Sequence, residues 1–335
     1  MKKEIREVVL FVTENCNLDC DYCYIKEKNG RNLDFNTGKK AIDLLKSSKS
    51  EEKLLHFFGG EPLLNFDVVK KLVEYGDGIK FQISTNGILL NDEILDFCKK
   101  NKIRLAISLD GDEASHNKHR GMFNKIKKWN YDDILYRMTV YPDLVGKMFE
   151  NTEFLYENYS KKIDVVPAYG VVWTKKDLEI FDKEYGKILD FYYENFGDIH
   201  ILSVEDEFIN FMNPYQKYCP FIKNIVVLPN GDIILCPYVL VFDKEKRGLY
   251  VVGNVFDGFK GKWKLCNYGS IECKNCFPEP YCHLTCLTYD FKDKKYYDAN
   301  LICNNNMLKE IIIKHSFGIY KKIKDTDLIK CIKNK

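Results

Sequence analysis

Short apolar runs alternate with longer helical patterns over the first 205 residues of this 335-residue chain. The patterns predict strands over 7–12, 54–60, 79–87, 103–111, 136–142, 163–170 and 199–204, and helices over 36–48, 66–76, 91–101, 145–159 and 175–196. Strands that alternate with helices form parallel βαβ units. Six such units predict an α/β fold, a partial (β/α)6 TIM-like barrel that is incomplete rather than closed by eight units.

Charge and composition exclude several classes of protein. Lys and Arg number 51 and Asp and Glu 49, which leaves a net charge of +2 and no electrostatic footprint for nucleic acid or an anionic membrane. The N-terminus lacks the long apolar region and cleavage site of a signal peptide, and no apolar run reaches about 18 residues. We expect a cytoplasmic protein whose thirteen cysteines are metal ligands or catalytic groups rather than disulfides.

The residues that can carry chemistry follow the predicted strands. A loop with three cysteines, Cys16, Cys20 and Cys23, comes directly after the first strand. The segments GGEP, STNG and SLDG end the second, third and fourth strands. Because barrels of this kind place their chemistry at the carboxyl ends of the strands, we expect these four segments to meet at one edge of the sheet.

Three cysteines are one fewer than a closed metal site requires. A four-iron cluster is usually held by four thiolates, so a loop with three leaves one iron able to bind a small molecule. Zinc is the alternative, but a three-cysteine zinc site needs a histidine or a fourth cysteine nearby. The nearest histidine in the sequence is His56.

The cysteine loop resembles that of the radical S-adenosylmethionine (radical SAM) enzymes. Their signature is Cys-x3-Cys-x2-Cys with an aromatic residue before the last cysteine, and Cys16, Cys20, Tyr22 and Cys23 occupy those positions. The resemblance covers about residues 6 to 205. It implies a [4Fe-4S] cluster and S-adenosylmethionine as cofactors, with an external electron donor of the ferredoxin or flavodoxin type. It also implies that a 5′-deoxyadenosyl radical abstracts a hydrogen atom from the substrate.

By the same resemblance, Gly59, Gly60 and Glu61 of the GGEP segment hold the amino group of the SAM methionine. An acidic side chain and free carbonyls suit an ammonium group, and glycine lets the backbone approach a ligand closely.

Four further positions resemble SAM contacts of related enzymes, together with Tyr22: they are Ser84, Ser108, Asp110 and Arg120. Arg120 would pair with the SAM carboxylate or with substrate, and Arg137 competes for that role. A structural polar residue at the barrel rim is the alternative for each.

The regular alternation of strand and helix patterns ends by about residue 213. The pattern predicts a hairpin over 225–237 with Asn230-Gly231 as its turn, a short strand within 249–258 and a cysteine-dense loop region over 266–303. Domains are therefore expected over 1–212, 213–305 and 306–335. The last is a helical tail, packed on the domain or presenting a partner-peptide surface.

The second cysteine region resembles the SPASM domain, which carries two auxiliary [4Fe-4S] clusters. Its seven positions are Cys219, Cys236, Cys273, Cys276, Cys282, Cys286 and Cys303. The resemblance assigns Cys219, Cys236 and Cys286 to the first cluster and the other four to the second. The first then lacks a ligand, which Cys266 could supply, or its iron lies open to substrate. A structural zinc domain is the alternative, and Cys98 is expected in the core.

SPASM relatives mostly modify peptides and proteins, so we expect a thioether or carbon–carbon crosslink in a ribosomal peptide, with auxiliary clusters taking up an electron. A sulfatase-maturating type of oxidase is the runner-up, although Pro237 and Tyr238 follow Cys236 where those enzymes carry an aspartate. A silent metal-binding scaffold is a third hypothesis. Only fifteen residues precede Cys16, so a leader peptide would need a separate binding protein or the tail. Candidates for the general base are Tyr238, His56 and Asp110.

Overall fold

The computed structural model describes residues 4–23, 25, 30–168, 171–212, 223–241, 247–248, 250–260 and 299–324. At 210, 238, 241, 299–306 and 309 it describes the backbone alone. The described strands form one eleven-stranded sheet in the order β11-β10-β9-β8-β1-β2-β3-β4-β5-β6-β7.

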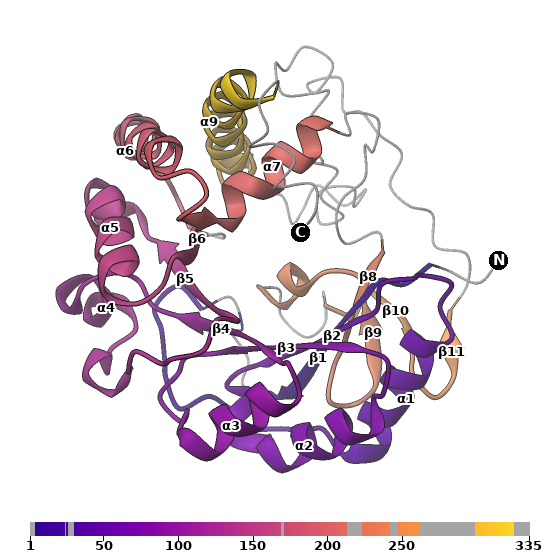
Figure 1. Cartoon of the computed structure of the whole chain (residues 1–335). Coiled ribbons are helices and arrows are strands. Elements are labelled where there is room, and N and C mark those ends of the chain that lie inside the picture. The colour runs from indigo at the N-terminus through magenta and orange to yellow at the C-terminus, as the bar shows by residue number, and fades with distance from the viewer. Residues whose placement is uncertain are drawn as a thin grey trace.

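Seven of these strands follow one another in parallel, each beside the next (Figure 1). Their bounds are β1 Glu7–Thr13, β2 Leu54–Gly59, β3 Lys80–Thr85, β4 Arg104–Ser108, β5 Ile134–Val140, β6 Lys162–Pro167 and β7 His200–Ile201. The sheet is curved and does not close, because β7 and β11 are its two edges. The predicted partial barrel is confirmed.

Helices cover the outer, convex side of the curved sheet (Figure 1). They are α1 Phe35–Lys46, α2 Phe66–Tyr75, α3 Asp92–Lys100, α4 Glu113–His119, α5 Met148–Asn158 and α6 Lys175–Glu194, followed by α7 Leu202–Met212 and α9 Ala299–Ile323. Short 3-10 turns are η1 Pro62–Asn65, η2 Phe123–Lys125, η3 Pro142–Lys147 and η5 Pro237–Val241.

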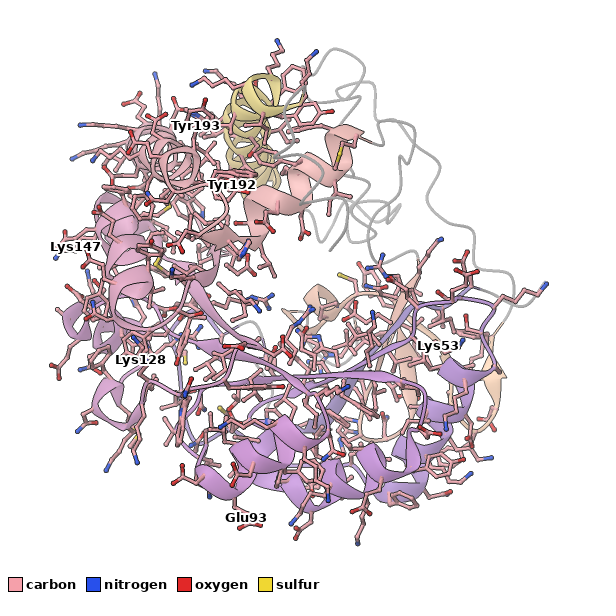
Figure 2. The ribbon with its side chains drawn as sticks, viewed as in Figure 1. Lys53, Glu93, Lys128, Lys147, Tyr192 and Tyr193 are labelled. Carbon is pink, nitrogen blue, oxygen red and sulfur yellow. The ribbon has the colours of Figure 1, made fainter. Side chains whose placement is uncertain are left out.

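Each helix divides between a buried and an exposed face, as the amphipathic pattern predicts. On α6, Tyr192 is 1% exposed and packs edge-on against Phe208 of α7, whereas its neighbour Tyr193 is 42% exposed (Figure 2). Charged residues such as Glu93 and Lys147 lie on the outer surface of the molecule.

Alternate residues of the strands point to opposite faces of the sheet, and the two faces differ in chemistry. Val8, Leu10 and Val12 of β1 belong to the large core beneath the helices. Val9 and Phe11 of the same strand belong to a smaller apolar cluster on the concave face. On the same face, the neighbouring strands carry polar side chains such as His56, Ser84 and Arg137 as well as the ring of Phe58.

The C-terminal part of the chain extends the same sheet. β8 Asn224–Val227 pairs in parallel with β1, and β9 Asp232–Ile234, β10 Val251–Asn254 and β11 Gly258–Phe259 continue antiparallel. The predicted hairpin turn is confirmed, since Gly231 has a φ of +84° and Leu228 N donates to Asp232 O at 2.9 Å.

Several local expectations were wrong. The helix expected over 36–48 begins at Phe35 and ends at Lys46, and Asp34 caps it because its side chain accepts from Thr37 N. The strand expected over 199–204 has only two residues, because α7 starts at Leu202. Residues 299–303 were expected in a loop but begin α9, which packs on α6 and α7. The second helix ends at Gly76 as predicted.

Candidate functional site

The three-cysteine loop leaves the carboxyl end of β1, where Cys16, Cys20 and Cys23 are half-buried. Leu18 N donates to Cys16 Sγ at 3.4 Å, and Cys23 N donates to Cys20 O at 3.0 Å, which folds the loop back on itself. Asn86, from the segment after β3, donates to Asn17 Oδ1 at 2.7 Å. The cysteine loop and the end of β3 therefore meet, as expected from the sequence.

Glycines at the end of β2 let that strand lie against the root of the cysteine loop. A Cβ on Gly59, whose φ is +136°, would lie 2.3 Å from Thr13 O, and one on Gly60 would lie 2.0 Å from Asn15 O. Gly60 N donates to Thr13 O and Glu61 N donates to Asn15 O. The sequence alone suggested that these glycines make room for a ligand; the structure shows that they make room for the chain's own backbone.

Glu61 is fully buried beneath this edge of the sheet. Its carboxyl accepts from Leu63 N at 3.0 Å, from Thr85 Oγ1 at 2.7 Å and from Asn86 N at 2.8 Å. Burial raises the pKa of Glu61 to about 7, although these hydrogen bonds act to lower it. The side chain thus fastens the end of β3 to the GGEP segment.

A second anchor of the cysteine loop is centred on Asp110, which follows β4 and is 3% exposed. Its Oδ2 accepts from the Tyr22 hydroxyl and, at 2.7 Å, from Arg120 Nε. Its Oδ1 accepts from Thr139 N at 2.8 Å. The Arg120 guanidinium also lies 5.1 Å from the centre of the Tyr22 ring. Tyr22, Asp110 and Arg120 are therefore brought together, with their polar atoms bonded to one another.

This anchor has clear electrostatic effects. Burial alone would lower the pKa of Arg120, but the adjacent Asp110 and Tyr22 raise it well above its usual value. Burial also raises the pKa of Tyr22, so its hydroxyl stays protonated and donates to Asp110. Burial raises the pKa of Cys20 to about 11, whereas Arg120 acts to lower it.

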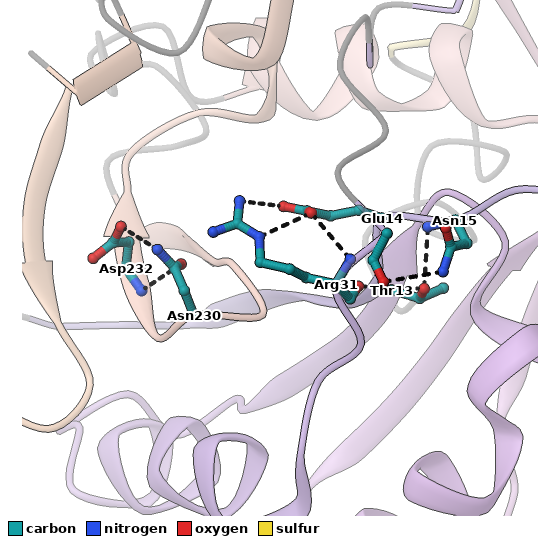
Figure 3. A network of polar contacts seen from close by, with 7 residues as sticks. Thr13, Glu14, Asn15, Arg31, Asn230 and Asp232 are labelled. Atoms are coloured by element: carbon teal, nitrogen blue, oxygen red, sulfur yellow. Dashed lines mark hydrogen bonds and ion pairs between the residues drawn. The ribbon is translucent and has the colours of Figure 1, made fainter.

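A salt-bridged network ties the other side of the loop's root to the following segment (Figure 3). Arg31 donates to both oxygens of Glu14, through Nε at 2.9 Å and Nη2 at 2.6 Å. The side chain of Glu14 is only 6% exposed. The hydrogen bond to Glu14 is the largest cause of a raised pKa of Arg31. Asp232 on the β8–β9 hairpin adds to that rise through its charge.

The concave face carries the remaining predicted residues. Ser84 Oγ lies 2.8 Å from His56 Nε2. Ser108 ends β4 and lies opposite Arg137 in the register. Arg137 Nε donates to Asp164 Oδ2 at 2.8 Å. Sequence reasoning named neither Asp164 nor Thr139; strand pairing places Asp164 of β6 opposite Arg137 of β5, two residues before Thr139.

The second cysteine region is described in part. Cys236 is 4% exposed and lies in the apolar cluster of β1 and the hairpin, against which Cys23 also packs. Cys219, Cys273, Cys276, Cys282 and Cys286 fall outside the described residues, as does Cys266, and the side chains of Tyr238 and Cys303 are not described. Their predicted roles stay predictions. Cys98 is fully buried on α3, as expected for a core residue.

The donor set of the loop fits an iron–sulfur cluster. Three thiols lie on one short loop, near enough that Cys16 and Cys23 affect the pKa of Cys20. Thiolates are the soft ligands that such clusters use. Among the described residues, no three His, Cys, Asp or Glu side chains converge as a single ion requires. His56 is bonded to Ser84 rather than to the loop, so it does not serve the zinc alternative.

Comparison with known proteins decides the family. A model of the radical SAM superfamily matches residues 10–140. An uncharacterised protein of Methanocaldococcus jannaschii is 30% identical over 304 residues, which cover 83% of this chain and 96% of that protein. The chain belongs to the radical SAM superfamily. It is a radical SAM enzyme, and this recognition from the sequence is confirmed.

Other radical SAM relatives are similar over most of their length. The cysteine-type anaerobic sulfatase-maturating enzyme of Clostridium novyi is 23% identical over 336 residues, 85% of this chain and 88% of that enzyme. The structure of native anSMEcpe with bound AdoMet has a TM-score of 0.71 at 18% identity, covering 98% of this chain and 99% of that one. SuiB of Streptococcus suis, bound to its precursor peptide SuiA, gives 0.57 at 18% identity, with 85% and 72% covered.

These similarities give the chain the fold of the SPASM-type radical SAM enzymes. Membership of the superfamily implies a [4Fe-4S] cluster and S-adenosylmethionine. In the described part of the chain, no helix is both long and apolar enough to cross a membrane.

Proposed function

We propose that this radical SAM enzyme modifies peptides and installs an intramolecular thioether or carbon–carbon crosslink in a small ribosomal peptide. The observation that carries the proposal is the placement of the cysteine loop. Asp110 and Glu61 anchor it at the carboxyl edge of a sheet whose concave face carries polar side chains on β2 to β6. Relatives of the same fold have been seen with peptides, namely SuiB with its precursor peptide SuiA and anSMEcpe with the Cp18Cys and Kp18Cys peptides.

Cys16, Cys20 and Cys23 would hold the cluster that binds SAM. When bound, that cluster and SAM would supply the radical chemistry by which a hydrogen atom is removed from a substrate carbon. The protein's own part is to fix the loop and to keep water from the reacting carbon. Among the described polar groups near the loop, the backbone carbonyls of Gly59 and Gly60 suit the SAM ammonium better than the Glu61 side chain, whose oxygens already accept three hydrogen bonds.

Tyr22, Ser84, Ser108 and Arg120 would line the rest of the SAM site. Arg120 is held by Asp110 through Nε, so its Nη atoms are the ones to meet a carboxylate; Nη2 also lies 3.3 Å from Thr139 Oγ1. Arg137 is paired with Asp164 on the concave face and suits a substrate group instead.

The C-terminal cysteines would hold two auxiliary [4Fe-4S] clusters in the assignment that the SPASM resemblance implies. One of them would take the electron that the substrate loses when the crosslink forms. The burial of Cys236 against the same apolar cluster as Cys23 supports this, because it puts one auxiliary ligand on the barrel side of the C-terminal region. A ferredoxin- or flavodoxin-type protein would supply the reducing electron, a separate protein would bind any leader peptide, and the enzyme would work in the cytoplasm.

A sulfatase-maturating type of oxidation is the second candidate, favoured by the full-length similarity to the Clostridium novyi enzyme. The segment after Cys236 argues against a sulfatase-maturating activity. Pro237 and Tyr238 begin η5 there, where those enzymes carry an aspartate that serves as base.

One experiment separates these functions. The reduced, iron-loaded enzyme is incubated with SAM and a panel of Cys-rich and Gly-rich synthetic peptides, alongside a sulfatase peptide. A crosslink removes two hydrogen atoms, suppresses fragmentation between the joined residues and leaves no carbonyl. A formylglycine product reacts with hydroxylamine instead. If SAM is cleaved and the product is a hydroxylamine-reactive peptide, the crosslinking proposal is wrong. If SAM is not cleaved at all, the protein is better described as a metal-binding scaffold without catalytic activity.

The auxiliary clusters are tested in the same assay. We expect Cys282→Ala to cleave SAM but to form no modified peptide, whereas Cys20→Ala cleaves none. Full product formation by Cys282→Ala would count against the role as electron acceptor.

A further inference from the structure

A chain of polar side chains crosses the concave face of the sheet. Ser84 Oγ lies 2.8 Å from His56 Nε2, and His56 Nδ1 lies 3.3 Å from Glu7 Oε1. The other oxygen of Glu7 accepts from Asn224 Nδ2 at 2.6 Å. Gln82 Nε2 also lies 3.3 Å from His56 Nε2. Serine, imidazole and carboxylate thus follow one another in direct contact.

The strand register explains why these residues meet. β1, β2 and β3 are adjacent and parallel, and His56 lies level with Val9 and Gln82. Alternate residues share a face, so the chain runs diagonally from Glu7, the first residue of β1, to Ser84 near the end of β3. β1 spans about 20 Å at the usual rise of a strand. This row of polar side chains therefore runs from near the carboxyl edge of the sheet toward the opposite end of the barrel.

The contacts select one tautomer of the imidazole. Glu7 accepts hydrogen bonds and offers none while ionised, so Nδ1 carries the proton and donates to Glu7. Nε2 is then an acceptor with one lone pair, and the Ser84 hydroxyl at 2.8 Å lies closer to it than the Gln82 amide at 3.3 Å. The order of hydroxyl, imidazole and carboxylate is the one in which a histidine takes a proton from serine and the acid stabilises the imidazolium.

The imidazole in the middle of this chain is more buried than Glu7 and Ser84 at its two ends. His56 is only 8% exposed, and the ring of Phe58, the next residue of β2 on the same face, lies edge-on to it at 5.5 Å. Ser84 is half-buried and precedes Asn86, which contacts the cysteine loop, by two residues. The half-buried Ser84, rather than the buried imidazole, is therefore the member of this chain that a substrate at the loop would meet.

We infer that Ser84, His56 and Glu7 form a proton relay for the crosslinking step; this inference rests on the proposed function. In that step a substrate C–H gives its hydrogen atom to the deoxyadenosyl carbon, and one electron goes to an auxiliary iron–sulfur cluster. A substrate thiol, or a second C–H, loses a proton as the new C–S or C–C bond forms. That proton passes to Ser84 Oγ while the hydroxyl proton passes to His56 Nε2, and Glu7 stabilises the imidazolium.

The first test needs no peptide. Nitrogen-15 NMR of the oxidised, iron-loaded enzyme at neutral pH reports which nitrogen of each of the six histidines carries hydrogen. His56→Gln identifies the resonances of His56 by their loss. The relay requires hydrogen on Nδ1 and a bare Nε2. Hydrogen on Nε2 overturns it, because the imidazole could then accept nothing from Ser84.

The second test uses a peptide that the wild-type enzyme crosslinks. In His56→Ala we expect the ratio of crosslinked peptide to 5′-deoxyadenosine to fall at least tenfold, and added imidazole to restore it. Glu7→Gln, which keeps the side-chain volume, should lower the ratio without response to imidazole. His315→Gln is the matched control, since His315 Nε2 lies 2.5 Å from Asp182 Oδ1 between α9 and α6 and far along the chain from the loop.

The outcomes separate the two proposals. An unchanged ratio in His56→Ala, or a lowered ratio that imidazole does not restore, overturns the relay while the crosslinking function stands. A wild-type enzyme that cleaves SAM but crosslinks none of the peptides overturns the proposed function, and the relay's role with it.

Discussion

The hydroxyl of Tyr22 donates to the carboxylate of Asp110, which joins the cysteine loop to the end of β4. The two residues are 88 positions apart in the chain. Because Asp110 is held in turn by Arg120 and by Thr139 N, the loop is connected through it to strand β5. A ligand loop that must present three thiols in one geometry gains from such an anchor.

Removing the Tyr22 hydroxyl tests this anchor. We expect Tyr22→Phe to lower the free energy of unfolding of the metal-free protein by about 2 kcal/mol, since a hydrogen bond to a buried carboxylate is lost. The reconstituted variant should also lose iron to a chelator several times faster than wild type. Urea unfolding and the rate of iron loss measure the two effects.

Tyr75→Phe is the matched control for that variant. Tyr75 donates to Asp43 Oδ1 at 2.6 Å on the helix-covered side, so the same kind of bond is removed away from the loop. Its iron retention should equal that of wild type. If both variants retain iron equally well, the Tyr22–Asp110 bond does not position the loop.

Glu61 should make stability depend on pH. Burial raises its pKa to about 7 from an ordinary value of 4.5, so between these pH values the native carboxyl keeps a proton that the unfolded chain has released. Stability contributed by this group is therefore present below about pH 4.5 and lost as the pH rises to about 7, by on the order of 3 kcal/mol.

The comparison of wild type with Glu61→Gln isolates this effect, because the amide does not titrate. Urea unfolding of the metal-free proteins at pH 5 and pH 7.5 should show the stability of wild type relative to Glu61→Gln decreasing as the pH rises. A difference that stays constant, or that grows with pH, would show that the hydrogen bonds from Leu63, Thr85 and Asn86 outweigh burial.

The Glu14–Arg31 pair should contribute more than the surface pairs of the protein. We expect Arg31→Met to cost about 2 kcal/mol, because it leaves the Glu14 carboxylate buried and unpaired; the partial exposure of Arg31 keeps the cost below that of a fully buried pair. Arg6→Met, which breaks a pair with Glu52 whose side chains are 63% and 60% exposed, should cost less than about 0.5 kcal/mol. Equal costs in thermal or urea unfolding would contradict the assigned burial of Glu14.

Iron content should distinguish the ligand cysteines from the core cysteine. We expect Cys20→Ala to lower the iron bound by the reconstituted protein by about four atoms, one cubane cluster. Cys98→Ala should keep all of its iron and lose about 1 kcal/mol of stability, since Cys98 is fully buried among apolar side chains on α3. Anaerobic iron and sulfide analysis decides the matter; an unchanged iron content in Cys20→Ala would refute the assignment of the loop.

The sequence by itself determined the architecture and the place of the chemistry. Period-two and helical patterns are local, and so is the Cys-x3-Cys-x2-Cys spacing, so each can be recognised without knowing what it packs against. The carboxyl ends of parallel strands meet at one edge for any such barrel, and this is why GGEP, STNG and the cysteine loop could be expected together.

Only the tertiary structure decided which polar groups satisfy one another. Glu61 accepts from Leu63, Thr85 and Asn86, and Arg120 donates Nε to Asp110, contacts that no sequence motif specifies. The partners of a buried charge are set by strand register and burial, which involve residues far apart in the chain.

Strand pairing also decided how the sheet continues beyond β1 and which polar side chains meet on its concave face. β8 pairs with β1, and Asn224 thereby reaches Glu7 across 217 positions of sequence. A strand's hydrophobic pattern predicts that it pairs but not with which strand, because the backbone hydrogen bonds are the same for every partner. Sequence motifs single out Ser84 and His56 separately and Glu7 not at all, and it is the pairing of three strands that brings the three into contact.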